Sequence, residues 1–198
     1  MSDAWDRTDP PPSPYPRSAP EPPITARALT RTVKRVRQTR EYLPTPVPAD
    51  ILEDILQVAR WTGSAGNRQP WTLIVVTDAE TKRKMAEAAP YTAHIGIAPA
   101  VIAVAMDPRG VETDNFEEGR LAERIMIAAT AHGLAGGIAR ARADAQPVIG
   151  SLLGVPADRV VRTLVSIGYP TAAALAPKSS PGTARKPLTE LVRRERFG

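Results

Sequence analysis

The chain contains no cysteine and only two histidines among its 198 residues. Without cysteine there can be no disulfide, thiolate nucleophile, cysteine-based zinc site or iron–sulfur cluster. The two histidines, His94 and His132, lie far apart in the sequence and have no carboxylates at ligand spacing. We therefore expect no metal site.

Long apolar runs are also missing. No stretch of about 18 apolar residues occurs, which predicts that the chain has no transmembrane helix. The first six residues, Met-Ser-Asp-Ala-Trp-Asp, have neither the basic start nor the apolar segment of a secretory signal. The sequence therefore predicts a cytoplasmic protein that does not contact a membrane.

Aromatic residues make up only 5% of the chain, although its formal net charge is +5. A basic balance is typical of proteins that bind nucleic acid, an anionic surface or a phosphate-bearing cofactor. Aromatic side chains do not alternate with the basic ones here, as they do in platforms that stack nucleic-acid bases. We therefore expect no nucleic-acid partner and interpret most of the charge as solvated helix faces. The basic residues form two clusters: Arg27, Arg31, Lys34, Arg35, Arg37 and Arg40, and Arg185, Lys186, Arg193, Arg194 and Arg196.

Prolines crowd residues 10–23. Proline prevents helix formation and sheet pairing and favours extended, solvated chain. Residues 1–26 are therefore predicted to form a proline-rich, disordered arm, and residues 27–198 a single domain.

Three apolar runs, at residues 71–76, 100–106 and 160–168, predict mostly buried strands. Helices are expected at residues 25–37, 48–60, 77–88, 116–132 and 147–153 and from about residue 187. A turn is expected at Gly136 and Gly137. Thr77 and Glu80 form a possible capping box for the third of these helices. Few strands, several helices and no repeating βαβ rhythm indicate an α+β domain.

Residues 37–42 read Arg-Gln-Thr-Arg-Glu-Tyr and place Arg37 and Arg40 three positions apart. Two side chains at that spacing can face one anion together. Guanidinium groups suit phosphate because they donate hydrogen bonds in pairs and stay charged. Taken alone, the segment is more simply interpreted as a solvated helix end.

Residues 64–71 read Ser-Ala-Gly-Asn-Arg-Gln-Pro-Trp and separate a predicted helix from a predicted strand. Gly66 and its small neighbours let the backbone approach a planar ligand, while the amides of Asn67 and Gln69 offer both donors and acceptors. An ordinary turn before a buried Trp71 would explain the glycine but not the two amides. We therefore favour a ligand-binding loop.

The order Ser-x-x-Asn-x-Gln-Pro-Trp resembles the signature loop of the nitroreductase family of flavoenzymes. Three more parts of the chain are similar to that family, in the family's order: residues 37–42, residues 127–138, and residues 167–170 taken together with 185–188. The chain departs from the family pattern at Val36 and Gln38, where Arg and Ser are usual. It also departs at Gly63 and Ala65, where Pro and Ser are common.

The resemblance implies FMN as the cofactor and NAD(P)H as the hydride donor. In the family, residues matching 37–42 and a late basic residue grip the FMN phosphate. The signature loop lines the isoalloxazine ring and ribityl chain, often from the opposite subunit, and a backbone amide near the glycine pair donates to flavin N5. Carried over by position, the FMN-binding residues are Arg37, Gln38, Arg40, Gly63, Ser64, Ala65, Asn67, Gln69, Gly136, Gly137, Ile138 and Arg185.

The resemblance also implies a mixed sheet flanked by helices and an intertwined homodimer with two FMN sites. The implied activity is ping-pong reduction of a nitroaromatic, quinone or related acceptor. No nucleophile–base pair stands out in the sequence, which is consistent with cofactor-based chemistry. Two alternatives stay open: a deazaflavin- or flavin-binding relative with a biosynthetic, dehalogenating or non-catalytic role, and a basic nucleic-acid-binding protein.

Overall fold

The computed structural model describes residues 25–177, 179 and 185–197. Almost all of the predicted proline-rich arm of residues 1–26 lies outside this described part. The elements in chain order are α1 (Ala26–Arg35), α2 (Ala49–Arg60), η1 (Ala65–Asn67), β1 (Trp71–Val76), α3 (Ala79–Ala88), η2 (Pro90–Thr92), α4 (His94–Ile97), β2 (Ala100–Met106), α5 (Val111–Ala131), β3 (Ala135–Arg140), α6 (Gln146–Leu152), β4 (Val160–Gly168), α7 (Ala172–Leu175) and α8 (Leu188–Leu191).

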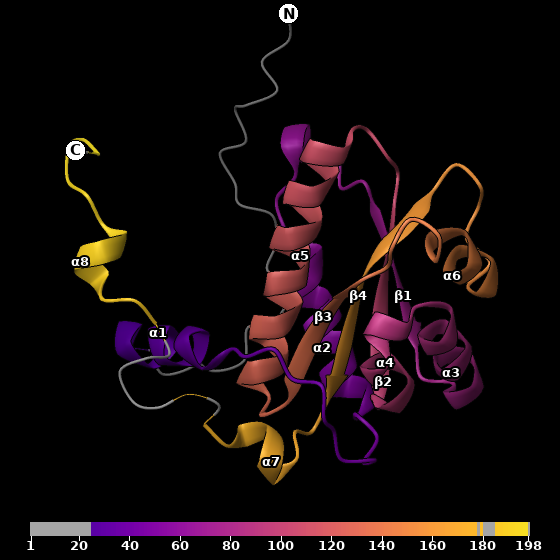
Figure 1. The fold of residues 1–198 in the computed structure, drawn as a ribbon, viewed down its shortest axis with the longest axis horizontal. Helices are drawn as coiled ribbons and strands as arrows, with labels where there is room; N and C mark the ends of the chain where they lie inside the picture. Colours follow the sequence, from indigo (N-terminus) through magenta and orange to yellow (C-terminus); the bar gives the residue numbers. More distant parts are fainter. Residues whose placement is uncertain (1–24, 178, 180–184, 198) are drawn as a thin grey trace, which may run out of the picture.

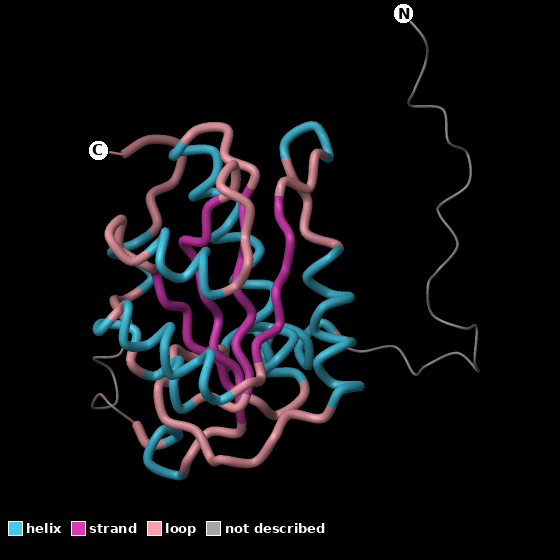
Figure 2. Tube along the Cα trace, turned by 90° about the vertical axis from the view of Figure 1, so that its right-hand side faces the viewer, coloured by secondary structure: helices cyan, strands magenta, loops and turns pink. Residues whose placement is uncertain are grey.

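The strands form one sheet in the order β1-β2-β4-β3, and each neighbouring pair is antiparallel. Residues 37–42 run along the outer edge of β3, where Gln38 forms a parallel bridge with Gly136. Helices cover both faces of the sheet, as Figures 1 and 2 show from two directions. The predicted α+β class is confirmed.

Strand β2 explains why the sheet has two cores. Ala100, Ile102, Val104 and Met106 are buried in a cluster with residues of α2 and α5, while Val101, Ala103 and Ala105 are buried in a second cluster with residues of α3, α4 and α6. A strand covered on both faces needs a continuous apolar sequence rather than an alternating one. The unbroken run at residues 100–106 has this property.

Two local expectations were wrong. The stretch around Gly136 and Gly137 was expected to be a turn, but it is the edge strand β3. The capping-box pair Thr77 and Glu80 does not cap α3 because Asp78 is the N-cap, and its Oδ2 accepts a hydrogen bond of 2.7 Å from the Thr81 N–H. The aspartate competes effectively because its charged oxygen is the stronger acceptor.

The longest helix, α5, begins at Val111, five residues before its predicted start. The predicted C-terminal helix is a single turn, Leu188–Leu191. No helix in the described part of the chain is long and apolar enough to cross a membrane.

Candidate functional site

The predicted FMN-binding residues form two groups in the structure. The first group, at positions 37–40 and 136–138, meets at the outer edge of β3. Arg37, Gln38 and Arg40 lie on the segment that runs along this strand, and Gly136, Gly137 and Ile138 lie on the strand itself. We call these six residues the basic edge. The two arginine side chains are exposed, and Arg37 Nη1 donates to the carbonyl of Leu175 at 3.4 Å.

Hydrogen bonds tie the two halves of the basic edge together. The N–H of Thr39 donates to the carbonyl of Gly136 at 2.7 Å, and the N–H of Ile138 donates to Oε1 of Gln38 at 2.7 Å. Gln38 occupies the position where the family pattern has Ser. Its side-chain oxygen is already engaged with the strand, so its amide nitrogen is the part left to meet a ligand.

Close packing explains the glycine at position 137. A Cβ there would collide with the carbonyl oxygen of Thr39 and would also lie 3.0 Å from Ser166 Oγ. Tyr42 fills the space beneath, where its hydroxyl donates to Thr39 O and forms a second hydrogen bond with Ser166 Oγ, both at 2.7 Å. Burial raises the pKa of Tyr42 to about 12, against the smaller lowering effects of Ser166 and Arg40. Tyr42 is therefore a neutral hydrogen-bonding group under physiological conditions.

His94, at the start of α4, is a second buried polar group at the basic edge. Its side chain is almost fully buried, and its Nε2 has no hydrogen-bond partner among the described residues. Burial lowers the pKa of His94, the positive charge of Arg40 lowers it further, and a hydrogen bond with the Gly137 backbone opposes the shift. His94 is thus held neutral next to an exposed cation.

The predicted residues of the second group form a tight loop at residues 63–69, which we call the signature loop. Gly66, Asn67 and Gln69 have φ angles of 60°, 53° and 50°, a left-handed conformation that is uncommon for residues with a Cβ. The N–H of Gln69 donates to Ser64 Oγ at 2.8 Å, which closes the loop. The exposed side chains of Asn67 and Gln69 lie together, with Gln69 Nε2 donating to Asn67 Oδ1 at 3.2 Å. Two amides thus face solvent on a strained backbone.

The sheet register places these two groups at opposite ends of the sheet. Gly137 pairs with Ser166, Ser166 with Val101, and Val101 with Val76, the last residue of β1. The signature loop instead precedes Trp71, the first residue of β1. Five residues along the strands and three strand spacings across them correspond to about 17 Å and about 14 Å. One chain therefore holds the groups farther apart than a flavin ring system is long.

Arg185, the last predicted residue, lies in the exposed stretch that leads into α8. Figure 1 shows α8 beyond α1, away from the sheet. The apolar side chains of Leu188, Leu191 and Phe197 on this C-terminal stretch are all more than 60% exposed. The C-terminal stretch thus presents apolar surface that the described part of the chain leaves uncovered.

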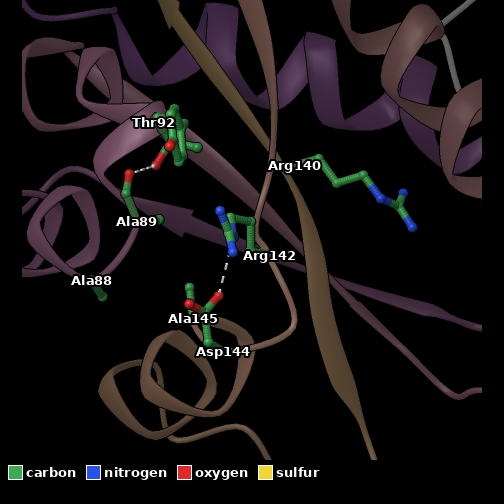
Figure 3. Close-up of a pocket in the computed structure, with 8 residues that line it drawn as sticks. Ala88, Ala89, Thr92, Arg140, Arg142, Asp144 and Ala145 are labelled. Carbon is green, nitrogen blue, oxygen red and sulfur yellow. Dashed lines mark hydrogen bonds and ion pairs between the residues drawn. The ribbon is translucent and has the colours of Figure 1, made fainter.

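A hollow of about 180 Å³ lies where the end of β3 meets η2 and α6 (Figure 3). Arg142 turns toward Asp144, with a closest N–O distance of 3.6 Å, and its guanidinium carbon lies 5.8 Å from the ring centre of Tyr91. Arg140 points away from this pair in Figure 3, toward Glu118, whose Oε2 lies 3.4 Å from Nη1. The two arginines of the hollow therefore do not converge on one anion.

A group of buried carboxylates at one end of α5 did not emerge from the sequence reasoning. Asp114, Glu117 and Glu118 are each only 1% exposed. With Leu121 and Ile125 they continue one inward stripe at helical spacing. That spacing is the signal that could have revealed them, because an acidic residue on an inward stripe must find a partner. In the described part of the chain, they are not arranged to hold a metal ion.

Comparison with known proteins agrees with this geometry. The Nitroreductase family model matches residues 33–107, which include residues 37–42 and the signature loop. A candidate NADH dehydrogenase/NAD(P)H nitroreductase of Archaeoglobus fulgidus is 35% identical over 141 residues, covering 68% of this chain and 80% of the relative. An iodotyrosine deiodinase of Nematostella vectensis is 23% identical over 196 residues, covering 82% of this chain and 73% of the relative.

A solved structure, the FMN-dependent nitroreductase of Clostridium difficile R20291, has a TM-score of 0.74 to this chain. The match covers 84% of this chain and 98% of that one, at 22% identity, and shows that the fold is shared. The family model and the Archaeoglobus relative extend the agreement to the sequence, and on this basis the chain belongs to the nitroreductase family.

Proposed function

We propose that the protein is an NAD(P)H-dependent FMN oxidoreductase that works as a homodimer. Each FMN would lie between the signature loop of one chain and the basic edge of the other. The observation that carries this proposal is the separation of the two groups at opposite ends of the sheet. Family membership supports the cofactor and the hydride donor.

The residues present at both groups suit FMN. Arg37 and Arg40 offer two exposed guanidinium groups to a phosphate, and Arg185 is the proposed third cation. The exposed amides of Asn67 and Gln69 can both donate and accept, as the polar edge of a flavin requires. When bound, FMN supplies the hydride chemistry, and the work of the chain is to bind it, orient it and exclude water.

The proposed roles of the chain's own groups follow from their surroundings. Ile138 N–H is held by Gln38, so a flavin atom at this edge would compete with the Gln38 carbonyl or meet its NH₂ instead. Gly63, Ser64 and Ala65 would bring backbone close to the ring. NAD(P)H and an acceptor such as a nitroaromatic, quinone or enone would use the same face in turn, which gives ping-pong kinetics.

Exposed apolar surface supports the proposal that a second copy of the chain completes the site. Helix α1 buries none of its residues, and its Leu29 and Val33 are exposed. The C-terminal stretch exposes Leu188, Leu191 and Phe197. Peripheral elements with apolar faces are typical of surfaces that another copy of the chain covers.

The purified protein should show flavin absorbance, and anaerobic NADH or NADPH should bleach it. The double variant Arg40→Ala, Arg185→Ala should lose FMN because the phosphate loses two charge-assisted contacts. Unchanged flavin content in that variant would contradict the phosphate assignment.

Mixing two defective chains tests the shared site directly. One chain would carry Arg37→Ala and Arg40→Ala; the other would carry Asn67→Gly and Gln69→Gly, which removes the amides and tolerates positive φ. Each alone should bind little FMN. After co-refolding, about a quarter of the sites should recover, because half of the dimers are mixed and each has one intact site. No recovery would show that both groups must come from one chain.

A second candidate function is reductive dehalogenation of a halogenated aromatic, which the alignment with the iodotyrosine deiodinase favours. Parallel assays with a nitroaromatic and with iodotyrosine under the same NAD(P)H supply would decide between the two. Release of iodide without nitroaromatic turnover would favour the dehalogenase.

A further inference from the structure

Helix α5 directs the neighbouring carboxylates of Glu117 and Glu118 toward different elements of the fold. Glu118 faces β4, where Arg162 Nε donates to its Oε1 at 3.0 Å and Thr163 Oγ1 donates to its Oε2 at 2.6 Å. Asp114, one turn earlier, accepts from Arg162 Nη2 at 2.9 Å. These two carboxylates are explained by the buried arginine that they neutralise.

Glu117 has no such explanation. It is 1% exposed, yet no cation pairs with it in the described part of the chain. Its Oε1 accepts one hydrogen bond of 2.7 Å, from the backbone N–H of Ala65. Its Oε2 is buried without a donor among the described residues. A carboxylate is costly to bury with one hydrogen bond, so its placement against the signature loop calls for a role there.

The signature loop needs support from outside itself. Its left-handed residues with a Cβ, Asn67 and Gln69, hold a conformation that persists only where the surroundings over-determine it. Ser64 supplies two bonds from within the loop, through Oγ to Gln69 N–H and through its carbonyl to Asn67 N–H at 2.9 Å. Within the described chain, residues 63–69 form two hydrogen bonds with other elements. Trp71 N–H, at the start of the adjoining β1, donates to the Gln69 carbonyl at 2.8 Å, and Ala65 N–H donates to Glu117 on the distant helix α5.

We propose that Glu117 is a positioning residue for the flavin site. It fixes the signature loop on α5 through the Ala65 N–H, so that the amides of Asn67 and Gln69 are presented in one orientation. This inference rests on the proposed function for its ligand, but the loop anchor itself can be measured without any flavin. The same helix is joined to β4 through Glu118. The position of the loop is therefore fixed relative to the sheet.

Three substitutions and one control in the 198-residue chain separate this role from general stability. Glu117→Ala removes the acceptor, whereas Glu117→Gln keeps an oxygen that can accept from Ala65. Ala65→Pro removes the donor without changing the core. It is compatible with the backbone, because Ser64 before it is extended (φ −136°, ψ 160°) and position 65 begins a helical turn. Ile125→Ala, two turns along the same helix in the apolar core, is the control for lost stability.

The first readout is amide hydrogen exchange of residues 63–69 in the flavin-free protein. Glu117→Ala should speed exchange of this loop about tenfold or more, the effect of losing a bond to a charged acceptor. Glu117→Gln should stay close to the wild type, and Ile125→Ala should not open the loop selectively. Unchanged loop exchange in Glu117→Ala, or equally fast exchange in Glu117→Gln, would overturn the proposal.

The second readout is FMN affinity, measured by quenching of flavin fluorescence. Glu117→Ala and Ala65→Pro should both weaken FMN binding about tenfold or more, while Glu117→Gln restores it. Full affinity in Ala65→Pro would overturn the positioning role. If the wild-type protein binds no FMN, the proposed function fails, and the exchange measurement alone decides whether Glu117 anchors the loop.

Discussion

Oε1 of Gln38 accepts a hydrogen bond of 2.7 Å from the backbone N–H of Ile138. This contact joins the arginine-bearing segment to β3 by a side chain as well as by the backbone bond from Thr39 to Gly136. A residue that replaces the serine of the family pattern thus serves as a clamp within the chain. Because Gln38 lies between Arg37 and Arg40 in the chain, we expect this clamp to help hold both arginines in place.

Replacing Gln38 with Ala should loosen the basic edge. The Ile138 N–H would lose its acceptor, and the free energy of unfolding should fall by about 1 kcal/mol. Urea denaturation measures the change. Gln38→Glu keeps the acceptor and is the matched control, so an equal loss in both variants would contradict the clamp.

Gly137→Ala should be strongly destabilising. The new methyl group would meet the backbone oxygen of Thr39, which cannot move without breaking its segment away from β3. We expect a loss of about 1–3 kcal/mol, typical of overpacking. Gly119→Ala is the control: it lies on α5 with no atom within 4 Å of the added Cβ, and should stabilise the helix by about 0.5–1 kcal/mol. Thermal unfolding of both variants decides the point.

Arg162→Leu should be the most damaging single change at the sheet. Its guanidinium lies 2.9 Å from both Asp114 and Glu118. Its removal leaves the buried Asp114 without a cation and leaves Glu118 with only the half-exposed Arg140, 3.4 Å away. Such a break costs about 3–5 kcal/mol. Arg124→Leu, an exposed arginine on α5, should cost far less. Similar urea midpoints for the two variants would show that the buried group is not a coupled unit.

His94 should make stability fall on the acid side of neutrality. Its folded-state pKa lies below the ordinary 6.5 because of burial and, next, the charge of Arg40. As the pH falls below 6.5, the unfolded chain binds the proton first, so the free energy of unfolding decreases until the folded-state pKa is reached. The stability difference between the wild type and His94→Asn should therefore shrink from pH 7.5 to pH 5.5. A pH-independent difference in urea midpoint would refute this.

Three strands could be predicted from the sequence with their correct bounds because they are mostly apolar. β3 could not, since Gly136 and Gly137 suggest a turn. Their presence reflects tertiary contact: Met126 crowds position 136 and Thr39 crowds position 137. Local propensity contains no information about such contacts.

The candidate site was predicted in its parts but not in its arrangement. The amides of Asn67 and Gln69 and the pair Arg37 and Arg40 follow from residue type and spacing. Their separation depends on strand order and register, which pair residues far apart in the chain. The burial of Glu117 could have been predicted from the sequence, because Glu117 lies between Asp114 and Leu121 on one inward stripe of the helix.

The distance between the signature loop and the basic edge also determines how the protein should respond to dilution. In the proposed dimer, a ligand that needs both groups would be held by a pair of chains, so its occupancy would depend on the total protein concentration as well as on its own. At low protein concentration, more ligand would be needed to keep the site filled. The fraction of flavin that stays bound during size-exclusion chromatography should therefore decrease as less protein is loaded.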